Sequence, residues 1–152
     1  MNPQANDQGA VAAALASAYG EKVWGTTLGV GSFLTLELGA QRPAREPTGR
    51  PHGTFHLWVY CSAWRIETTQ QIIASSEDAR EKLEPAVKVL DGHTLHNAEV
   101  QWPSLSATFH FDGGLVLRTF SIFSAEYDHW LFYLPDEHVL TAGPGSTVTF
   151  SR

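Results

Sequence analysis

The sequence predicts an α+β domain built mainly from antiparallel strands, with two helices. Apolar and polar residues alternate as in strands along much of the chain, most clearly over Leu105–Phe111. Turns rich in Gly, Pro and Asp separate these segments. Two strand–loop–strand units also resemble each other, which predicts a sheet with an internal repeat. The strands form either a half-open barrel or a sandwich, and the pattern leaves both architectures open.

The repeat relates residues 31–64 to residues 105–130. Three aligned pairs define the register that we expect, namely Phe55 with Leu117, Val59 with Ser121, and Ser62 with Ser124. A gap then brings Trp64 near Trp130. A repeat of this kind describes an architecture and says nothing about chemistry.

The composition describes one domain: 152 residues, of which 17% are charged and 11% aromatic. The net charge of −6 lies in one half of the chain. Residues 1–76 carry five Lys or Arg against five Asp or Glu, whereas residues 77–152 carry five against eleven. A nucleic-acid partner would need clustered positive charge, so we exclude one. The same negative field permits a basic protein partner.

Two features bear on the compartment. Cys61 is the single cysteine, so no intrachain disulfide can form, and no neighbour in the sequence activates its thiol. No run of 18 apolar residues is present, so we expect no membrane partner. The stretch Gly9–Tyr19 is apolar, but no Lys or Arg precedes it, and this disfavours a signal peptide. We expect a cytoplasmic protein.

The chain begins with a polar segment, residues 1–8, which we expect to be a disordered tail. Asp7 then caps a helix over Gly9–Tyr19, and Gly20 can end it. Strands follow over Val23–Val30 and Phe33–Leu38.

A long connection follows. Residues 39–53 contain three prolines, three glycines and three arginines, so we expect a long flexible loop over residues 40–52. The matching connection in the second unit is only Asp112-Gly113-Gly114, which is typical of a compact hairpin turn. A loop gained by one copy carries function or is a tolerated insertion, and both readings stay open.

The middle of the chain predicts a central strand and a helix. Phe55–Tyr60 has bulky residues on both faces, which favours a central strand covered on both sides, and Trp64–Ile66 continues or pairs with it. Ser75 with Asp78 resembles a capping box, which predicts a helix starting there. Pro85 predicts a break or kink in that helix.

Six further strands complete the prediction, the last of them at a sheet edge. They are Thr94–Val100, Leu105–Phe111, Leu115–Phe123, Trp130–Leu134, Val139–Ala142 and Val148–Phe150.

The chain shows no constellation for catalysis. There is no Gly-x-Ser-x-Gly elbow and no phosphate-binding loop. His52 and His56, like His93 and His96, lie at spacings that suit a metal only on a helix, and these segments read as loop and strand. We therefore assign no catalytic residue, no metal site and no cofactor.

An acidic and aromatic group offers a surface for recognition. Acidic side chains at turns, placed beside aromatic rings, suit the capture of a basic partner. The candidate binding patch consists of Glu126, Tyr127, Asp128, Trp130, Asp136 and Glu137. The loop from Arg42 to Arg50 is a second candidate.

A pocket between the two units is the alternative site. His56, Trp58, His110 and Arg118 occupy outward positions of the repeated hairpins, so they converge if the units face each other. A small-ligand-binding protein or an enzyme would use such a pocket.

The second half also carries turn and core motifs of a known type. These are Leu90-Asp91-Gly92, the hairpin Phe109–Leu115, Trp130-Leu131, Leu134-Pro135-Asp136, and the closing Gly143–Ser146. They resemble the C-terminal part of a group of small uncharacterised bacterial proteins with a Gly-Gly hairpin, a late Trp and a Gly-Pro-Gly-Ser close. The resemblance implies no activity and no catalytic residue. Some acidic bacterial α+β proteins of this size are immunity proteins, which mask a toxin.

These observations favour a non-enzymatic protein-binding module, immunity-like in type, that acts through the acidic and aromatic patch. A ligand-binding protein or enzyme with the pocket just described is the first alternative. A structural homodimer paired through the last strand is the second.

Overall fold

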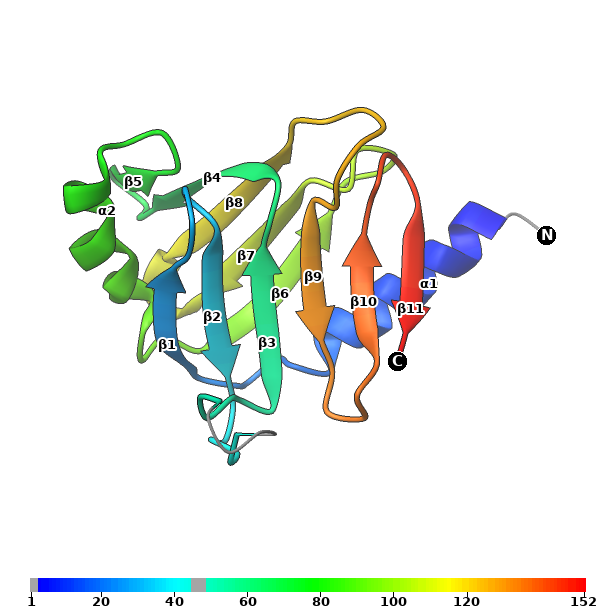
Figure 1. Ribbon diagram of the computed structural model, residues 1–152, viewed down its shortest axis with the longest axis horizontal. Helices are drawn as coiled ribbons and strands as arrows, with labels where there is room; N and C mark the ends of the chain where they lie inside the picture. The colour runs from blue at the N-terminus through cyan, green and yellow to red at the C-terminus, as the bar shows by residue number, and fades with distance from the viewer. Residues whose placement is uncertain (1–2, 45–48) are drawn as a thin grey trace.

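The computed structural model describes residues 3–44 and 49–152. Within them, eleven strands form two antiparallel sheets. The order is β1-β2-β3-β9-β10-β11 in the six-stranded sheet and β5-β4-β8-β7-β6 in the five-stranded sheet. The sheets face each other and do not close into a barrel (Figure 1). The α+β class is confirmed, and the sandwich is the correct one of the two predicted architectures.

The elements have the following bounds. The strands are β1 (Val23–Leu28), β2 (Leu34–Leu38), β3 (Phe55–Val59), β4 (Ser62–Glu67), β5 (Ile72–Ser75), β6 (Leu95–Val100), β7 (Ala107–Phe111), β8 (Val116–Ser121), β9 (Trp130–Tyr133), β10 (Val139–Ala142) and β11 (Val148–Ser151). The helices are α1 (Pro3–Ala16) and α2 (Arg80–Ala86), with 3₁₀ turns η1 (Val87–Leu90) and η2 (Asp112–Gly114).

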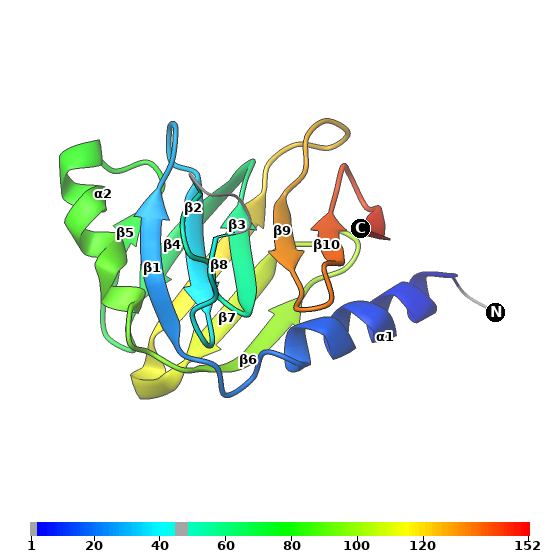
Figure 2. The ribbon, with the colours of Figure 1, turned by 60° about the horizontal axis from the view of Figure 1, so that its bottom comes forward.

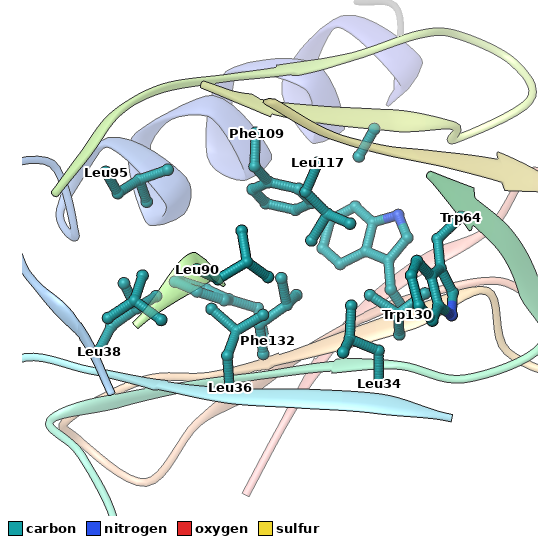
Figure 3. Close-up of a cluster of buried hydrophobic side chains, with 14 of the residues drawn as sticks. Leu34, Leu36, Leu38, Trp64, Leu90, Leu95, Phe109, Leu117, Trp130 and Phe132 are labelled. Carbon is teal, nitrogen blue, oxygen red and sulfur yellow. The ribbon is translucent and has the colours of Figure 1, made fainter. Parts of the chain in front are cut away.

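Period-two alternation builds the core. In β2, β3 and β7, every second side chain is buried and the others are half-exposed. The buried rows of the two sheets meet in one cluster, in which Leu36 and Phe132 of one sheet lie across from Phe109 and Leu117 of the other (Figure 3). Residues of both helices join the same cluster. Large buried rings and aliphatic chains of this kind supply most of the driving force for folding.

β3 lies in the interior of its sheet, as predicted, but the prediction that both of its faces are covered is wrong. β3 lies between β2 and β9, in the interior of the six-stranded sheet. The other sheet covers only the face that carries Phe55, Leu57 and Val59, which are all buried. His56 and Trp58 point to the outer face and are half-buried there.

Helix α1 begins earlier than predicted. It starts at Pro3, so residues 3–8 are helical instead of a tail, and Asp7 lies within the helix instead of capping it. Proline suits the first turn, because the N–H that it lacks would have no partner there. Residues 1–2 lie outside the described residues. Val11 and Leu15 dock the helix on the core.

The second helix also begins late. The N-cap of α2 is Ala79, and no side chain caps the helix. The capping-box pair is present one turn earlier, where the backbone N–H of Ser75 donates to Asp78 Oδ2 at 2.9 Å. The predicted break is confirmed, because α-helical geometry ends at Ala86, just after Pro85, and η1 continues as a 3₁₀ turn.

Apart from β11, the strands and helices form two units with the same order of elements. We call α1 with β1–β5 the first unit, and α2 and η1 with β6–β10 the second. In each unit, three strands form a meander in one sheet and the last two cross to the other sheet, so β9-β10 extends β1-β2-β3 and β4-β5 extends β8-β7-β6. Helix α1 packs on β6, and α2 with η1 packs on β1 (Figure 2). Each unit therefore completes the other.

Matched hydrogen bonds relate the two units as a twofold axis would. The N–H of Gly20 donates to Leu95 O at 2.8 Å, and that of Gly92 donates to Val23 O at 2.8 Å. Both glycines have left-handed φ angles, +93° and +89°, after their helices. Lys22 and Thr94 bridge each other between these pairs.

The two buried tryptophans, Trp64 and Trp130, occupy equivalent positions, as predicted. The indole N–H of Trp64 donates to Ser32 O at 2.7 Å, and that of Trp130 donates to Leu105 O at 2.8 Å. Each accepting residue lies two positions before the second strand of its unit, β2 or β7.

The predicted register of the repeat is wrong by two residues. Phe55 pairs with Leu38, and Leu115 bonds Phe111, so Phe55 is equivalent to Leu115 and not to Leu117. Val59 is correspondingly equivalent to Thr119. A slip of two residues keeps every side chain on its face, so the alternation of apolar and polar residues does not detect it.

No helix in the described part of the chain is long and apolar enough to cross a membrane.

Candidate functional site

The two units differ most at two connections. Residues 39–54 join β2 to β3, whereas Asp112–Gly114 make the equivalent connection in the second unit. Residues 122–129 join β8 to β9, whereas Tyr60 and Cys61 alone join β3 to β4. The two long connections lie at opposite ends of the sandwich (Figure 1). In each case the other unit closes its sheet without the extra segment. The fold therefore does not need these two segments, and they are available for function.

The long β8–β9 connection exposes large apolar side chains beside carboxylates. Ile122 is 60% exposed and Tyr127 52%, and Phe120 and Phe123 are exposed to about 40%. We call the β8–β9 surface the set formed by Phe120, near the end of β8, together with Ile122, Phe123, Glu126, Tyr127 and Asp128 of the connection. Exposed apolar side chains that gather on one surface are typical of interaction sites.

Ring contacts fix the shape of the β8–β9 surface. The rings of Phe123 and Tyr127 lie edge to face, with centroids 4.9 Å apart. The Arg65 guanidinium lies 5.3 Å from the centroid of the Phe120 ring. Tyr127 has a φ of +63°, a region that a bulky residue rarely adopts outside tight or functional segments. The aromatic side chains are therefore held in place while they stay exposed.

The far end of the connection is anchored to the β3–β4 crossing. His129 O accepts a hydrogen bond from Ser62 Oγ at 2.9 Å, and Asp128 O accepts one from Cys61 N at 3.2 Å. The His129 ring is 1% exposed, and its Nε2 donates to Gly145 O at 2.9 Å, since a carbonyl only accepts. These bonds hold the far end of the β8–β9 connection on the sandwich.

The carboxylates of the β8–β9 surface are available to a partner. Among the described residues, no ion pair involves Glu126 or Asp128. Burial, with the charge of Asp128, raises the pKa of the neighbouring Cys61 thiol. A raised pKa keeps that thiol protonated at neutral pH and makes it a poor nucleophile.

The predicted acidic and aromatic patch does not form one surface. Glu126 and Tyr127 are exposed in the β8–β9 connection, with Asp128 half-buried beside them. Trp130 is 0% exposed and belongs to the core. Asp136 and Glu137 lie in the β9–β10 turn, at the opposite end of β9 (Figure 1). A strand thus separates two groups of acids that are close in sequence, and only the first group joins aromatic side chains.

The predicted convergence of the alternative pocket residues is wrong. His56 and Trp58 lie on β3, on the outer face of the six-stranded sheet. His110 and Arg118 lie on β7 and β8 of the five-stranded sheet, where His110 pairs with Glu99 at 2.9 Å. Outward positions of facing sheets point away from each other, so these side chains cannot line one cavity.

Four histidines, His56, His93, His110 and His138, each pair with one carboxylate. His93 Nδ1 lies 2.9 Å from Asp112 Oδ1, and His138 Nδ1 lies 2.9 Å from Asp136 Oδ2. In residues 3–44 and 49–152, no group of three His, Cys, Asp or Glu side chains is placed to hold a metal ion.

The sequence interpretation missed Phe120, Ile122 and Phe123 as surface residues. The expected strand Leu115–Phe123 contains all three; Phe120 does lie in β8, whereas Ile122 and Phe123 lie beyond its end at Ser121. A signal was present for two of them, because Phe120 and Ile122 have the same parity as the outward-facing Arg118. Period two therefore places the ring of Phe120 and the side chain of Ile122 outside the core.

Comparisons with protein-family models, with curated proteins and with solved structures found no match for this chain.

Proposed function

We propose that this protein is a non-enzymatic binding module that docks a basic protein partner through the β8–β9 surface. One observation carries the proposal. The second unit has an extra connection that exposes three large apolar side chains, Ile122, Phe123 and Tyr127, beside two carboxylates that form no ion pair among the described residues, and the first unit closes its sheet without such a segment.

The chemistry of the surface suits protein recognition. Buried aromatic anchors supply most of the affinity of protein interfaces, and Tyr127 and Phe123 are pre-oriented for that role. Glu126 and Asp128 favour a partner with Lys or Arg around an apolar centre. The net charge of −6 adds a long-range attraction for such a partner.

An immunity-like role in the bacterial cytoplasm is the specific form of this proposal. In that role the protein masks a basic toxin. The support comes from the acidic second half of the chain and from the resemblance of its turn motifs to small bacterial proteins.

Capture of the partner from lysate of the source cells, with matched variants, tests the proposal. Glu126→Lys reverses one charge in the β8–β9 surface, and Glu137→Lys makes the same change at the other end of β9. We expect Glu126→Lys to reduce the capture of a basic protein by roughly tenfold or more and Glu137→Lys to leave it unchanged. Circular dichroism and thermal unfolding show that both variants are folded.

Equal capture by the two variants contradicts the assignment of the surface. Loss of capture with Glu137→Lys alone would move the binding site to the β9–β10 turn. A Tyr127→Ser variant adds an apolar test, because its loss of affinity should persist at high salt, where the charge effect is screened.

Self-association through β11 is the alternative. β11 forms an edge of the six-stranded sheet, and Phe150 on it is 41% exposed. An open edge can pair with a second copy of the chain. Sedimentation of the purified protein separates the two: a stable dimer that Phe150→Lys dissociates supports this alternative, and a monomer excludes it.

A further inference from the structure

A cavity of about 1100 Å³ lies over the outer face of the six-stranded sheet and shares no residue with the β8–β9 surface. Residues 41–43 and 49–54 of the long β2–β3 connection form its roof. Half-buried side chains of β1, β2, β3 and β9 form its floor, and they are Trp24, Thr27, Thr35, Glu37, His56 and Tyr133. This volume is large enough for a small organic ligand.

The base of the roof is fixed to the sheet. Arg42 and His52 exchange backbone hydrogen bonds of 2.7 and 3.1 Å. Gly53 lies so close to β2 that a Cβ there would be 2.6 Å from Leu38 O, which only glycine avoids. The N–H of Gly53 donates to Glu37 Oε1 at 2.9 Å. The same contacts therefore fix the position of the cavity wall and of the Glu37 carboxylate.

Glu37 orients His56 as a hydrogen-bonding group of the floor. Glu37 Oε2 lies 2.5 Å from His56 Nδ1, and the two side chains are 12% and 26% exposed. A carboxylate only accepts, so Nδ1 carries the hydrogen and Nε2 of the neutral ring is an acceptor. The His56 ring meets the Tyr133 ring edge-on at 5.2 Å, and among the described residues none bonds Nε2. A carboxylate that holds an imidazole in one orientation leaves the second nitrogen available to a ligand.

Two arginines, Arg42 and Arg50, and two glutamates, Glu37 and Glu137, line the same cavity. Arg42 and Arg50 are both exposed lining residues, and neither forms an ion pair within residues 3–44 and 49–152. Guanidinium groups bind carboxylates and phosphates through paired hydrogen bonds. Both oxygens of the Glu37 carboxylate have partners in Gly53 and His56, so neither oxygen pairs with an arginine.

The other unit shows that the fold does not require this arrangement. Glu37 pairs with His56 across β2 and β3, and the equivalent pair across β7 and β8 is His110 with Val116. The equivalent connection, Asp112–Gly114, is too short to form a roof.

We propose that the cavity is a binding site for a small organic anion that also carries a hydroxyl or amine group. Arg42 and Arg50 hold its carboxylate or phosphate, and His56 Nε2 accepts the hydrogen of its O–H or N–H. Glu37 acts as a positioning residue that keeps Nε2 turned to the ligand. This site is independent of the protein-binding surface.

NMR titration of the His56 Cε1–Hε1 signal tests the site with defined probes. The first set is 4-hydroxybenzoate, benzoate, which lacks the hydroxyl, and 4-hydroxybenzamide, which lacks the charge. A wider set of hydroxy- and amino-carboxylates and organic phosphates follows. We expect a saturable shift with members that carry both groups, and roughly tenfold weaker binding when either group is removed.

Two variants locate the two contacts. The double variant Arg42→Gln with Arg50→Gln should bind the anion roughly tenfold or more weakly. Arg152→Gln should have no effect on binding, because Arg152 does not line the cavity. Glu37→Gln should remove the preference for the hydroxyl while the preference for the anion remains. A variant in which Asp-Gly-Gly replaces residues 39–54 removes the roof and should abolish the shift.

Three results would overturn the proposal. The first is that no compound of the wider set shifts the His56 signal in a saturable way. The second is that charged and neutral analogues bind equally well. The third is that the arginine double variant, shown to be folded by its NMR spectrum, binds as tightly as the parent protein.

Discussion

The first and second units share one scaffold and differ in what that scaffold carries. Equivalent hydrogen bonds tie Gly20 to Leu95 and Gly92 to Val23, and an indole bond closes each unit. The long β2–β3 connection belongs to the first unit alone and the long β8–β9 connection to the second alone. The comparison thus separates residues that the fold needs twice from residues that were free to acquire a function.

The outer faces of the two sheets differ in the same way. On the five-stranded sheet, Glu67 accepts hydrogen bonds from Arg65 and from Arg118. The positions equivalent to these three on the six-stranded sheet hold Tyr133, Leu131 and Trp58. One outer face is thus covered by an ion network, and the other carries aromatic side chains near a cavity.

The largest effect should come from the equivalent tryptophans. Trp130→Phe leaves Leu105 O without its partner inside the core and should lower the free energy of unfolding by about 3 kcal/mol. Trp64→Phe should cost about 2 kcal/mol, because the bond to Ser32 O is only partly buried and water can replace it. Urea unfolding measures both. If Trp64→Phe lowered the free energy of unfolding more than Trp130→Phe, the proposed difference between the units would be wrong.

The two helix-terminal glycines provide a sharper test of equivalence. A Cβ at Gly20 or Gly92 meets no atom within 4 Å, so alanine adds only the strain of a left-handed φ. Each substitution should cost about 1 kcal/mol, with both values equal to within about 0.5 kcal/mol.

Gly9→Ala is the matched control for these two substitutions. Gly9 lies within α1, also with open space around its Cα, so alanine there should raise stability by up to about 1 kcal/mol. Unequal losses at Gly20 and Gly92 would show that the two helix ends are not equivalent in energy.

The ion network should make the stability that the five-stranded sheet gains on its outer face depend on pH. Burial raises the pKa of Glu67, but hydrogen bonds and charges of Arg65 and Arg118 outweigh it, so the pKa lies below its ordinary value of 4.5. A lowered native pKa stabilises the fold above the unfolded pKa, and this gain disappears as pH falls through the native value.

Glu67→Gln should therefore lower stability by about 1 kcal/mol at pH 7, since both arginines are partly exposed. The difference from the parent protein should vanish in acid, below the native pKa. Chemical denaturation at pH 7 and at pH 3 measures it. A difference that stays constant between these two pH values would show that the carboxylate charge is not the cause.

The smallest effect concerns the short β3–β4 crossing. Asp128→Asn removes a charge that helps to raise the pKa of Cys61, so the thiolate fraction and the rate of alkylation by iodoacetamide at pH 8 should rise by roughly twofold. Glu126→Gln removes a charge from the same connection and should leave the rate unchanged, because Glu126 does not contribute to the raised pKa of Cys61. Equal acceleration by both would point to a general field effect.

Much of the fold follows from period-two alternation in the sequence. β2, β3 and β7 lie where alternating leucines and phenylalanines predict them, and β3 is interior as expected. Alternation does not detect a slip of two residues, which is why the register of the repeat was wrong. Nor does it locate the start of α1, which depends on the first-turn tolerance of Pro3.

The candidate sites were harder to predict because they depend on pairings between distant segments. Proximity in sequence placed Trp130 and Asp136 in one patch, although one is core and the other lies beyond the end of β9. His56 was identified, but its partner Glu37 was not, because they become neighbours only when β2 and β3 pair with Glu37 opposite His56.

The exchange of strands between the units has a consequence for synthesis on the ribosome. When β1, β2 and β3 have emerged, β3 is an exposed edge that waits for Trp130–Tyr133, the strand it will bond last. β4 likewise waits for Val116–Ser121. Neither half can therefore fold and dock as an independent intermediate, and the nascent chain must keep two open edges from pairing with other chains until nearly its whole length is made.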